Sequence, residues 1–193
     1  THPPRTATSH GVYLLFGARD LPPSLSSREI LDSGRGSRFE GQIWWSNAGG
    51  ALGAPGDLNG DGLGDFLIGE SGAGDRTGVV YLVHGRSEFP EVVKLASIAN
   101  DELGVMFSGV SETLRPSGAG AAIAILDHDG DGTNDFLIGA PSFDEGRAGV
   151  LGRVYIVFGQ AFAPGMRSRG EIESGELRGA LFTSEGSEAL GST

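Results

Sequence analysis

The chain has 193 residues, the length of one or two domains, and 38% of them are hydrophobic, which is enough to bury a core and excludes a wholly disordered chain. Acidic residues outnumber basic ones 25 to 14, for a net charge of −11, and such a surface repels phosphate backbones and anionic lipid. We therefore expect no nucleic-acid partner. The sequence contains no cysteine, which excludes disulfides and thiolate metal sites.

Glycine is the compositional outlier, with 34 residues that do not recur at every third position. This excludes collagen and favours many tight turns between short strands. The sequence has no run of eighteen apolar residues, so we predict no membrane insertion. The first residues lack the apolar stretch of a signal peptide.

Three sequence markers recur along the chain in a constant order. The first is a β-branched and aromatic run that ends at a glycine and is typical of a strand. It occurs at Val12–Gly17, Val80–Gly85 and Val154–Gly159. The second is Gly-x-x-Phe, with copies at Gly36/Phe39, Gly104/Phe107 and Gly179/Phe182.

The third marker is an acidic loop that runs directly into Phe-Leu-Ile-Gly. Its copies begin at Asp57 and at Asp127, and nine of their first thirteen aligned positions are identical without a gap. Such a duplication within one chain indicates an internal repeat. The repeat unit therefore runs from Gly-x-x-Phe through the acidic loop to the Val-Tyr strand.

Each repeat contains candidates for about four short strands. The first complete repeat has them near Ala51–Ala54, Phe66–Gly69, Val79–His84 and Val92–Ile98, and the second near Gly120–Leu126, Phe136–Gly139, Arg153–Phe158 and Glu171–Leu177. No segment has a sustained 3.6-residue apolar period. Four short strands joined by glycine-rich turns are typical of a β-propeller blade.

We therefore predict an all-β chain made of β-propeller blades of four antiparallel strands. Residues 1–33 would end one blade, residues 34–101 and 102–176 would form two full blades, and residues 177–193 would begin another. A propeller closes with roughly four to eight blades, so this stretch forms an incomplete propeller. Either the remaining blades of a longer chain or self-association with further copies would complete the ring.

The two acidic loops, 57–65 and 127–135, have the composition of cation sites. Side-chain oxygens recur at alternate positions, and hard cations such as Ca²⁺ take about six to eight oxygen ligands. In the first loop the predicted ligands are Asp57, Asn59, Asp61, Asp65 and the backbone carbonyl of Leu63. In the second they are Asp127, Asp129, Asp131, Asp135 and the carbonyl of Thr133. Glycine at the sixth position, Gly62 or Gly132, would let the backbone turn sharply around the ion.

A solvated acidic turn is the alternative interpretation of these loops, because Asp, Asn and Gly are common turn residues. However, two carboxylates about 5 Å apart repel by about 3 kcal/mol at an effective dielectric near 20, which favours a counter-ion. An EF-hand would need Glu at the twelfth position, where Ile68 and Ile138 stand instead. Zinc would favour His or Cys ligands, and Mg²⁺ a more rigid octahedron. We predict two Ca²⁺ sites.

At these residues the chain resembles the FG-GAP repeats of the integrin α-subunit β-propeller. Phe16-Gly17 and Phe158-Gly159 match the first half of the name, and Gly139-Ala140-Pro141 matches the second. The first full repeat departs from the pattern, with His84-Gly85 and Gly69-Glu70-Ser71. The resemblance implies a propeller with calcium loops between the first and second strands of its blades. It also implies a secreted or cell-surface setting and a protein or glycan ligand.

Function is less constrained than fold. The sequence has no Gly-x-Ser-x-Gly nucleophile motif and its four histidines show no metal spacing, so we predict no catalytic residues and no enzymatic activity. The leading hypothesis is an adhesion or ligand-binding module with calcium as a structural brace. An accessory propeller of a hydrolase or lyase and a self-assembling partial propeller are the alternatives.

The dipeptide Trp44-Trp45 is the other notable feature. Adjacent residues of a strand face opposite sides, so one indole would be buried and the other exposed for a sugar or protein contact. Packing of the pair in the core or at its rim is the competing interpretation.

Overall fold

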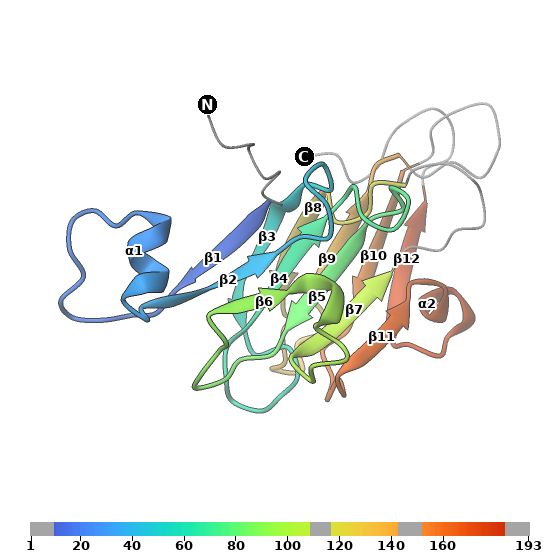
Figure 1. The fold of residues 1–193 in the computed structure, drawn as a ribbon. Coiled ribbons are helices and arrows are strands. Elements are labelled where there is room, and N and C mark those ends of the chain that lie inside the picture. Colours follow the sequence, from blue (N-terminus) through green and yellow to red (C-terminus); the bar gives the residue numbers. More distant parts are fainter. Residues whose placement is uncertain (1–9, 109–116, 143–151, 184–193) are drawn as a thin grey trace, which may run out of the picture.

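The computed structural model describes residues 10–108, 117–142 and 152–183, which form twelve strands and a few short helical turns (Figure 1). The strands are β1 (Gly11–Leu15), β2 (Gly36–Glu40), β3 (Ala48–Gly56), β4 (Asp65–Glu70), β5 (Val79–Val83), β6 (Val92–Lys94), β7 (Gly104–Ser108), β8 (Ala122–Leu126), β9 (Asp135–Ala140), β10 (Arg153–Val157), β11 (Gly165–Ser168) and β12 (Gly179–Thr183). The helical elements are α1 (Ser27–Asp32), η1 (Leu95–Ser97) and α2 (Gly170–Ser174).

The strands form three sheets, in the orders β1-β2-β6, β11-β7-β5-β4-β3 and β12-β10-β9-β8. Strands β3, β4, β5 and β7 pair antiparallel in one sheet, and β8, β9, β10 and β12 do so in the next. The prediction of an all-β, incomplete propeller is confirmed. The strands expected around Phe66, Val79, Phe136 and Arg153 are also confirmed, with ends that move by a residue or two.

The Val-Tyr and Gly-x-x-Phe markers are neighbouring antiparallel strands, and they pair in one register three times. The Val of the first marker lies opposite the Phe of the second in every pair: Val12 with Phe39, Val80 with Phe107 and Val154 with Phe182. The glycine that begins Gly-x-x-Phe lies where a side chain would collide with the partner backbone. A Cβ on Gly104 would lie 2.0 Å from the carbonyl oxygen of Leu82.

The fourth strand of the central sheet differs from the one expected from the sequence. Val92–Ile98 was expected as the fourth strand beside β5, but β7 takes that place because its Val80–Phe107 register buries the phenylalanine. Val92–Lys94 is a strand, β6, and it pairs parallel with β2 of the preceding sheet. In the same way β11 pairs parallel with β7. In both cases a strand from later in the chain pairs with the outer strand of the preceding sheet, and this makes the central sheet five-stranded. The blade boundaries at 34–101 and 102–176 remain predictions.

The strand expected at Glu171–Leu177 is wrong, because Gly170–Ser174 form the helix α2. The helix ends at Gly175, whose φ of 79° is the left-handed conformation that commonly terminates helices. One helical turn and its cap bring Ile172 and Leu177 into the same apolar cluster. An extended strand would place these two side chains, which are five residues apart, on opposite faces.

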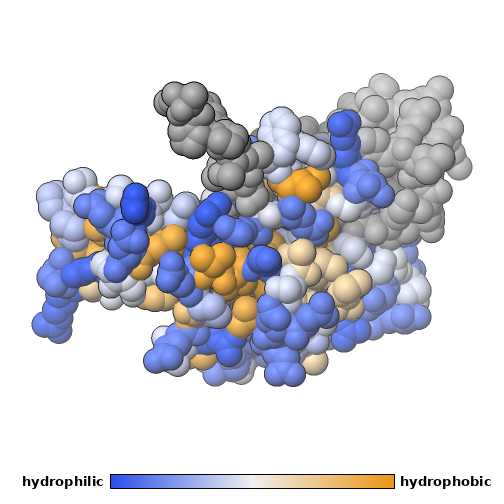
Figure 2. Space-filling model, viewed as in Figure 1, coloured by the Kyte–Doolittle hydropathy of each residue, from blue (hydrophilic) through white to orange (hydrophobic). Residues whose placement is uncertain are grey.

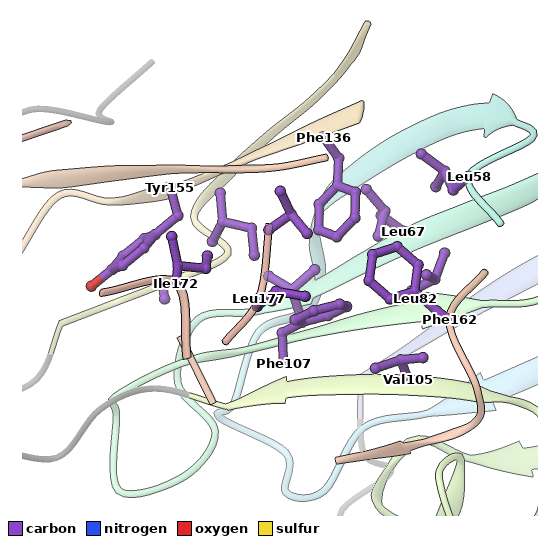
Figure 3. Packing of buried hydrophobic residues seen from close by; sticks show 14 of the residues in the cluster. Leu58, Leu67, Leu82, Val105, Phe107, Phe136, Tyr155, Phe162, Ile172 and Leu177 are labelled. Carbon is purple, nitrogen blue, oxygen red and sulfur yellow. The ribbon is translucent and has the colours of Figure 1, made fainter. Parts of the chain in front are cut away.

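The core consists of two apolar layers, one on each side of the central sheet. The side chains of β5 alternate between them: Val80 and Leu82 face β9 and β10, whereas Tyr81 faces the small sheet. Figure 3 shows the first layer, in which Phe107, Phe136 and Phe162 meet edge to face. Burial on both faces explains why β5 is apolar at every position, without the alternation of a half-exposed strand.

A buried arginine joins the central sheet to the next one. Arg169 donates hydrogen bonds to the carbonyl oxygens of Thr77 (3.1 Å) and Ser108 (3.2 Å), and its guanidinium lies 5.2 Å from the ring centre of Tyr155. Burial lowers the pKa of Arg169 to about 10. The side chain therefore keeps its charge at neutral pH.

The surface carries both hydrophilic and apolar residues. Figure 2 shows hydrophilic residues around an apolar area in the middle of the face in view, where the small sheet β1-β2-β6 lies. Leu15 of β1 and Val92 of β6 are among the exposed apolar residues of that sheet. Within the described parts of the chain, none of the helices has the length and apolar character needed to cross a membrane.

The close approach at Gly104 gives the first prediction. Gly104→Ala should lower the free energy of unfolding by about 2 kcal/mol, because the new methyl group forces β5 and β7 apart. Urea unfolding measures the change. Gly17→Ala is the matched control, since no atom lies within 4 Å of a Cβ built there. Equal stability of the two variants would contradict the packing argument.

Candidate metal centre

The two acidic loops occupy equivalent turns. Loop 57–65 joins β3 to β4 and loop 127–135 joins β8 to β9, so both lie between the first and second strands of their sheets, at the lower end of the sheets in Figure 1. This is the position that the resemblance implied.

Backbone N–H groups hold both loops in the same shape. The carboxylate at the first position accepts hydrogen bonds from the fourth and sixth residues: Asp57 from Gly60 and Gly62, and Asp127 from Gly130 and Gly132. The sixth-position glycines have φ of 84° and 91°, as the sharp turn requires. The fourth-position glycines are also left-handed, a requirement that the sequence interpretation missed.

The second loop brings three carboxylates together. One oxygen each from Asp127, Asp129 and Asp135 lies within 4.8 Å of the others. Asp131 lies in the same turn, where its Oδ1 accepts a hydrogen bond from Thr133 N (2.8 Å). An all-oxygen donor set of this kind suits a hard cation. The loop can therefore hold a metal ion with the residues present.

The first loop has the same backbone but one fewer carboxylate. Asn59 stands where the second loop has Asp129, and its side chain donates to Asp61 Oδ2 (3.0 Å). Among the described residues, the second loop alone brings three acidic or histidine donors within that distance. The amide oxygen of Asn59 accepts from Asp61 N (2.8 Å) and still points into the turn. The carbonyls of Leu63 and Thr133 remain predicted ligands.

The ninth-position aspartates are buried and brace the loops. Asp135 accepts hydrogen bonds from His128 N (2.7 Å) and Gly159 N (2.8 Å), and Asp65 accepts the equivalent pair from Leu58 N (3.0 Å) and Gly85 N (2.7 Å). Each oxygen accepts a single N–H and keeps a second lone-pair site for a cation. These aspartates therefore tie the loop and the end of the Val-Tyr strand to the start of the second strand.

Burial is the main cause that raises the pKa of the Asp65 carboxyl, and the Asp61 carboxylate adds to the increase. The two N–H donors oppose it. Burial likewise lowers the pKa of the neighbouring His84 imidazole. A bound cation would stabilise the ionised form of Asp65, which this environment otherwise disfavours.

Gly85 and Gly159, whose N–H groups donate to the buried aspartates, each end a Val-Tyr run in the sequence. The sequence did not indicate this role. A Cβ on Gly159 would lie 2.4 Å from the carbonyl oxygen of Asn134, and one on Gly85 would lie 2.5 Å from that of Gly64. Glycine is therefore needed for the backbone to come within reach of the buried aspartate.

Two further contacts were not predicted from sequence. The N–H of Asn134 donates to the carbonyl of Asp57 (3.1 Å), so the loops lie against each other. Arg178 forms an ion pair with Asp129 (3.3 Å), and its guanidinium lies 5.5 Å from the ring centre of Phe158. Arg178 supplies part of the positive charge that the acidic cluster needs. Nothing in its sequence context distinguished it from other surface arginines.

Residues 119–157 match the FG-GAP repeat family. This stretch contains the second acidic loop together with β9 and β10. The resemblance drawn from the motifs is therefore confirmed.

Curated relatives match a larger part of the chain. Phosphatidylinositol-glycan-specific phospholipase D from Bos taurus is 37% identical over 108 residues, which are 53% of this chain and 12% of that protein. The protein of the same name from Mus musculus is 33% identical over 108 residues, with the same coverage. Integrin alpha pat-2 from Caenorhabditis briggsae is 33% identical over 112 residues, which are 58% of this chain and 8% of that protein. The chain thus spans 12% or less of the relatives it matches.

The buried brace gives the second prediction. Asp135→Ala should lower the free energy of unfolding in EDTA by about 3 kcal/mol, because it leaves the N–H groups of His128 and Gly159 without their acceptor. Chemical denaturation in EDTA measures it without a contribution from metal. Asp131→Ala is the control, since it removes an exposed carboxylate that accepts one N–H, and we expect a loss below about 1 kcal/mol. Similar losses for both variants would refute the bracing role.

Proposed function

We propose that this chain is a calcium-binding, non-enzymatic β-propeller module of a secreted or cell-surface protein, with calcium as a structural brace and with adhesion or ligand binding as its task. The observation that carries the proposal is the convergence of Asp127, Asp129 and Asp135 in a loop that the chain repeats. The FG-GAP match over the same loop supports it.

Calcium fits these loops better than other cations. The donors are carboxylate, amide and carbonyl oxygens in an irregular turn, which suits the flexible coordination of Ca²⁺ more than the rigid octahedron of Mg²⁺. Zinc would favour nitrogen or sulfur ligands. His128 is the histidine of the second loop, but its ring stacks on Phe158, with centroids 6.0 Å apart, and does not join the carboxylates.

The placement of the loops favours a brace over a catalyst. Each ion would sit in a turn between two strands of one sheet, where the ninth-position aspartate already ties three chain segments together. Binding energy at such a site adds to the free energy of folding. Ligand recognition would then take place on a different surface.

A surface or secreted setting and a protein or glycan ligand follow from the resemblance to integrin α-subunits. The match to integrin alpha pat-2 supports this side of the proposal, and the net charge of −11 argues against nucleic acid.

An accessory module of a hydrolase is the second candidate, and the names of the mammalian relatives favour it. Four of them are phosphatidylinositol-glycan-specific phospholipases D. In that case the catalytic residues would lie in another part of the same protein. The parent reading frame discriminates, since a hydrolase domain beside the repeats favours this candidate.

The partner that completes the propeller is proposed to be either further blades of the parent protein or a second copy of this chain. The outer strands β2 and β7 each pair with a parallel strand from later in the chain, whereas β12 has no such partner among the described residues. An unpaired strand edge favours addition of another strand. Light scattering discriminates, because a monodisperse monomer excludes self-association.

Calcium dependence of stability is the third prediction. One site at a free Ca²⁺ of 100 times its Kd adds about 2.7 kcal/mol, and in a chain of this size each kcal/mol raises Tm by about 2–4 °C. Excess Ca²⁺ should therefore raise Tm by at least about 5 °C over EDTA in thermal melting. Mg²⁺ at the same concentration is the control for a general ionic effect. Equal melting temperatures in Ca²⁺ and EDTA would refute the brace.

The ligand assignment gives the fourth prediction. Asp131→Ala should weaken Ca²⁺ binding more than Asn59→Ala, because the first variant removes a charged ligand and the second a neutral one. Calorimetric Ca²⁺ titration of both variants and of the unaltered chain measures the difference. The reverse order would count against the predicted ligands.

A further inference from the structure

A cleft of about 490 Å³ opens at the opposite end of the sheets from the acidic loops. Strands β4 and β9 begin at those loops, and the cleft is lined by residues that follow their other ends, Ser71 after β4 and Pro141 and Ser142 after β9. The turn between β2 and β3 contributes Trp44, Trp45 and Asn47. Its volume lies within the range of small-molecule pockets.

Both tryptophans are exposed. The sequence had suggested either one buried and one exposed indole, or packing of the pair in the core or at its rim. Residues 44 and 45 form a turn rather than a strand, and Trp44 and Trp45 are 55% and 54% exposed. Their ring centres lie 5.1 Å apart, with the rings at 87°. Neither ring is a core residue, and large aromatic side chains left in water in a concave site are typical of ligand contacts.

A buried carboxylate holds this turn in place. Glu70 accepts hydrogen bonds from Gln42 N (2.7 Å), from Tyr81 Oη (2.7 Å) and from the hydroxyl of Ser46. Burial, and next the Glu70 carboxylate, raise the pKa of the Tyr81 phenol, so it stays a donor. These bonds fix both ends of the five-residue segment Gln42–Ser46, which carries the two indoles.

A backbone hydrogen bond adds a second restraint: Gly72 N donates to Ser46 O (2.8 Å). A Cβ on Gly72 would lie 2.9 Å from Ser46 Cα, so glycine is required for this approach. The tryptophans are therefore presented on a preformed turn, which lowers the entropy cost of binding a ligand. Glu70-Ser71 at this place, in contrast to Ala140-Pro141, is the departure from Gly-Ala-Pro seen in the sequence.

The remaining lining offers short hydrogen-bonding groups. The Asn47 amide donates weakly to Ser71 Oγ (3.4 Å), and Ser142 and Arg76 are exposed at the rim. Amide and hydroxyl groups can each donate and accept, and the guanidinium can donate several bonds. The cleft thus combines aromatic surfaces with several neutral donors and acceptors.

We propose that this cleft binds carbohydrate, with Trp44 and Trp45 stacking on the C–H faces of pyranose rings and Asn47, Ser71 and Ser142 pairing with hydroxyl groups. The inference rests on the proposed function and names the ligand class of its binding site. Pyranose rings carry apolar faces and polar edges, and the negative faces of indole rings attract polarised C–H groups.

Other ligand classes fit this cleft less well. Nucleic acid is disfavoured by the net charge of −11. A quaternary ammonium ligand would be repelled by Arg76, and an acyl chain would leave the polar lining groups without partners. A protein could instead bind to the same two tryptophans, and the experiment below distinguishes that outcome.

The chain contains no tryptophan besides these two, so tryptophan emission reports on the cleft alone. The experiment first screens the protein in Ca²⁺ on an array of neutral and acidic oligosaccharides, and then titrates the strongest binder while tryptophan emission is recorded. We expect saturable binding with a change in emission. If no oligosaccharide on the array binds at millimolar concentration, the carbohydrate assignment is overturned.

Variants link binding to the cleft. Trp44→Ala and Trp45→Ala should each weaken binding by about tenfold, since each removes one stacking surface. Met166→Ala is the matched control, because Met166 is 64% exposed on β11, outside the residues that line the cleft, and binding should be unchanged. Unaltered binding in the double tryptophan variant overturns the site. Binding of a protein but of no sugar, lost in the same variants, overturns the ligand class.

Asp131→Ala separates this inference from the proposed function. It should reduce the Ca²⁺-dependent rise in Tm and leave sugar affinity in excess Ca²⁺ unchanged, because the loop and the cleft lie at opposite ends of the sheets. A Ca²⁺-dependent Tm without sugar binding rejects the cleft and leaves the brace standing. Sugar binding without any Ca²⁺ effect on Tm rejects the brace and leaves the cleft standing.

Discussion

The buried aspartate that begins the second strand of each complete sheet is the interaction on which the rest of the structure depends. Asp65 and Asp135 each accept one N–H from the acidic loop and one from the glycine that ends the Val-Tyr strand. A single carboxylate thus fixes three chain segments at the same end of a sheet. Because an unpaired buried carboxylate is costly, these bonds must form together with the strands they join.

The sheets depend on a second constraint, the close approach of neighbouring backbones. Gly104 and its equivalents Gly36 and Gly179 each lie where a Cβ would be within 2.4 Å of a carbonyl oxygen of the neighbouring strand. That approach sets the register in which Val80 lies opposite Phe107 and in which the phenylalanine enters the core. The markers that recur in the sequence are therefore residues that fix strand pairing, and this explains why they recur together with the acidic loops.

Much of this could be predicted from sequence, because backbone requirements leave local patterns. Asp57–Asp65 and Asp127–Asp135 were identified as turns between paired strands, and β4, β5, β9 and β10 followed from their apolar runs. Partner choice over long range could not be predicted: β6 and β11 pair with a preceding sheet, and Arg178 reaches Asp129 from a distant segment. α2 was missed because a single helical turn is too short for a helical period, and its placement depends on the burial of Ile172. The Trp44–Trp45 turn depends on Glu70, whose role appears once Tyr81 and Ser46 lie beside it.

Strand β4 joins the two ends of the molecule, with buried Asp65 at its first residue and buried Glu70 at its last. The first carboxylate organises the acidic loop and the second organises the tryptophan turn. The side chains between them, Leu67 and Ile68, are fully buried in the two core layers, so the strand cannot shift at one end without disturbing the packing along its length. An ion bound at the loop would therefore add to the stability of the whole sheet, while the hydrogen bonds of Glu70 hold the tryptophan turn at the other end. Two functions, a brace and a recognition surface, can in this way share one short strand without sharing a residue.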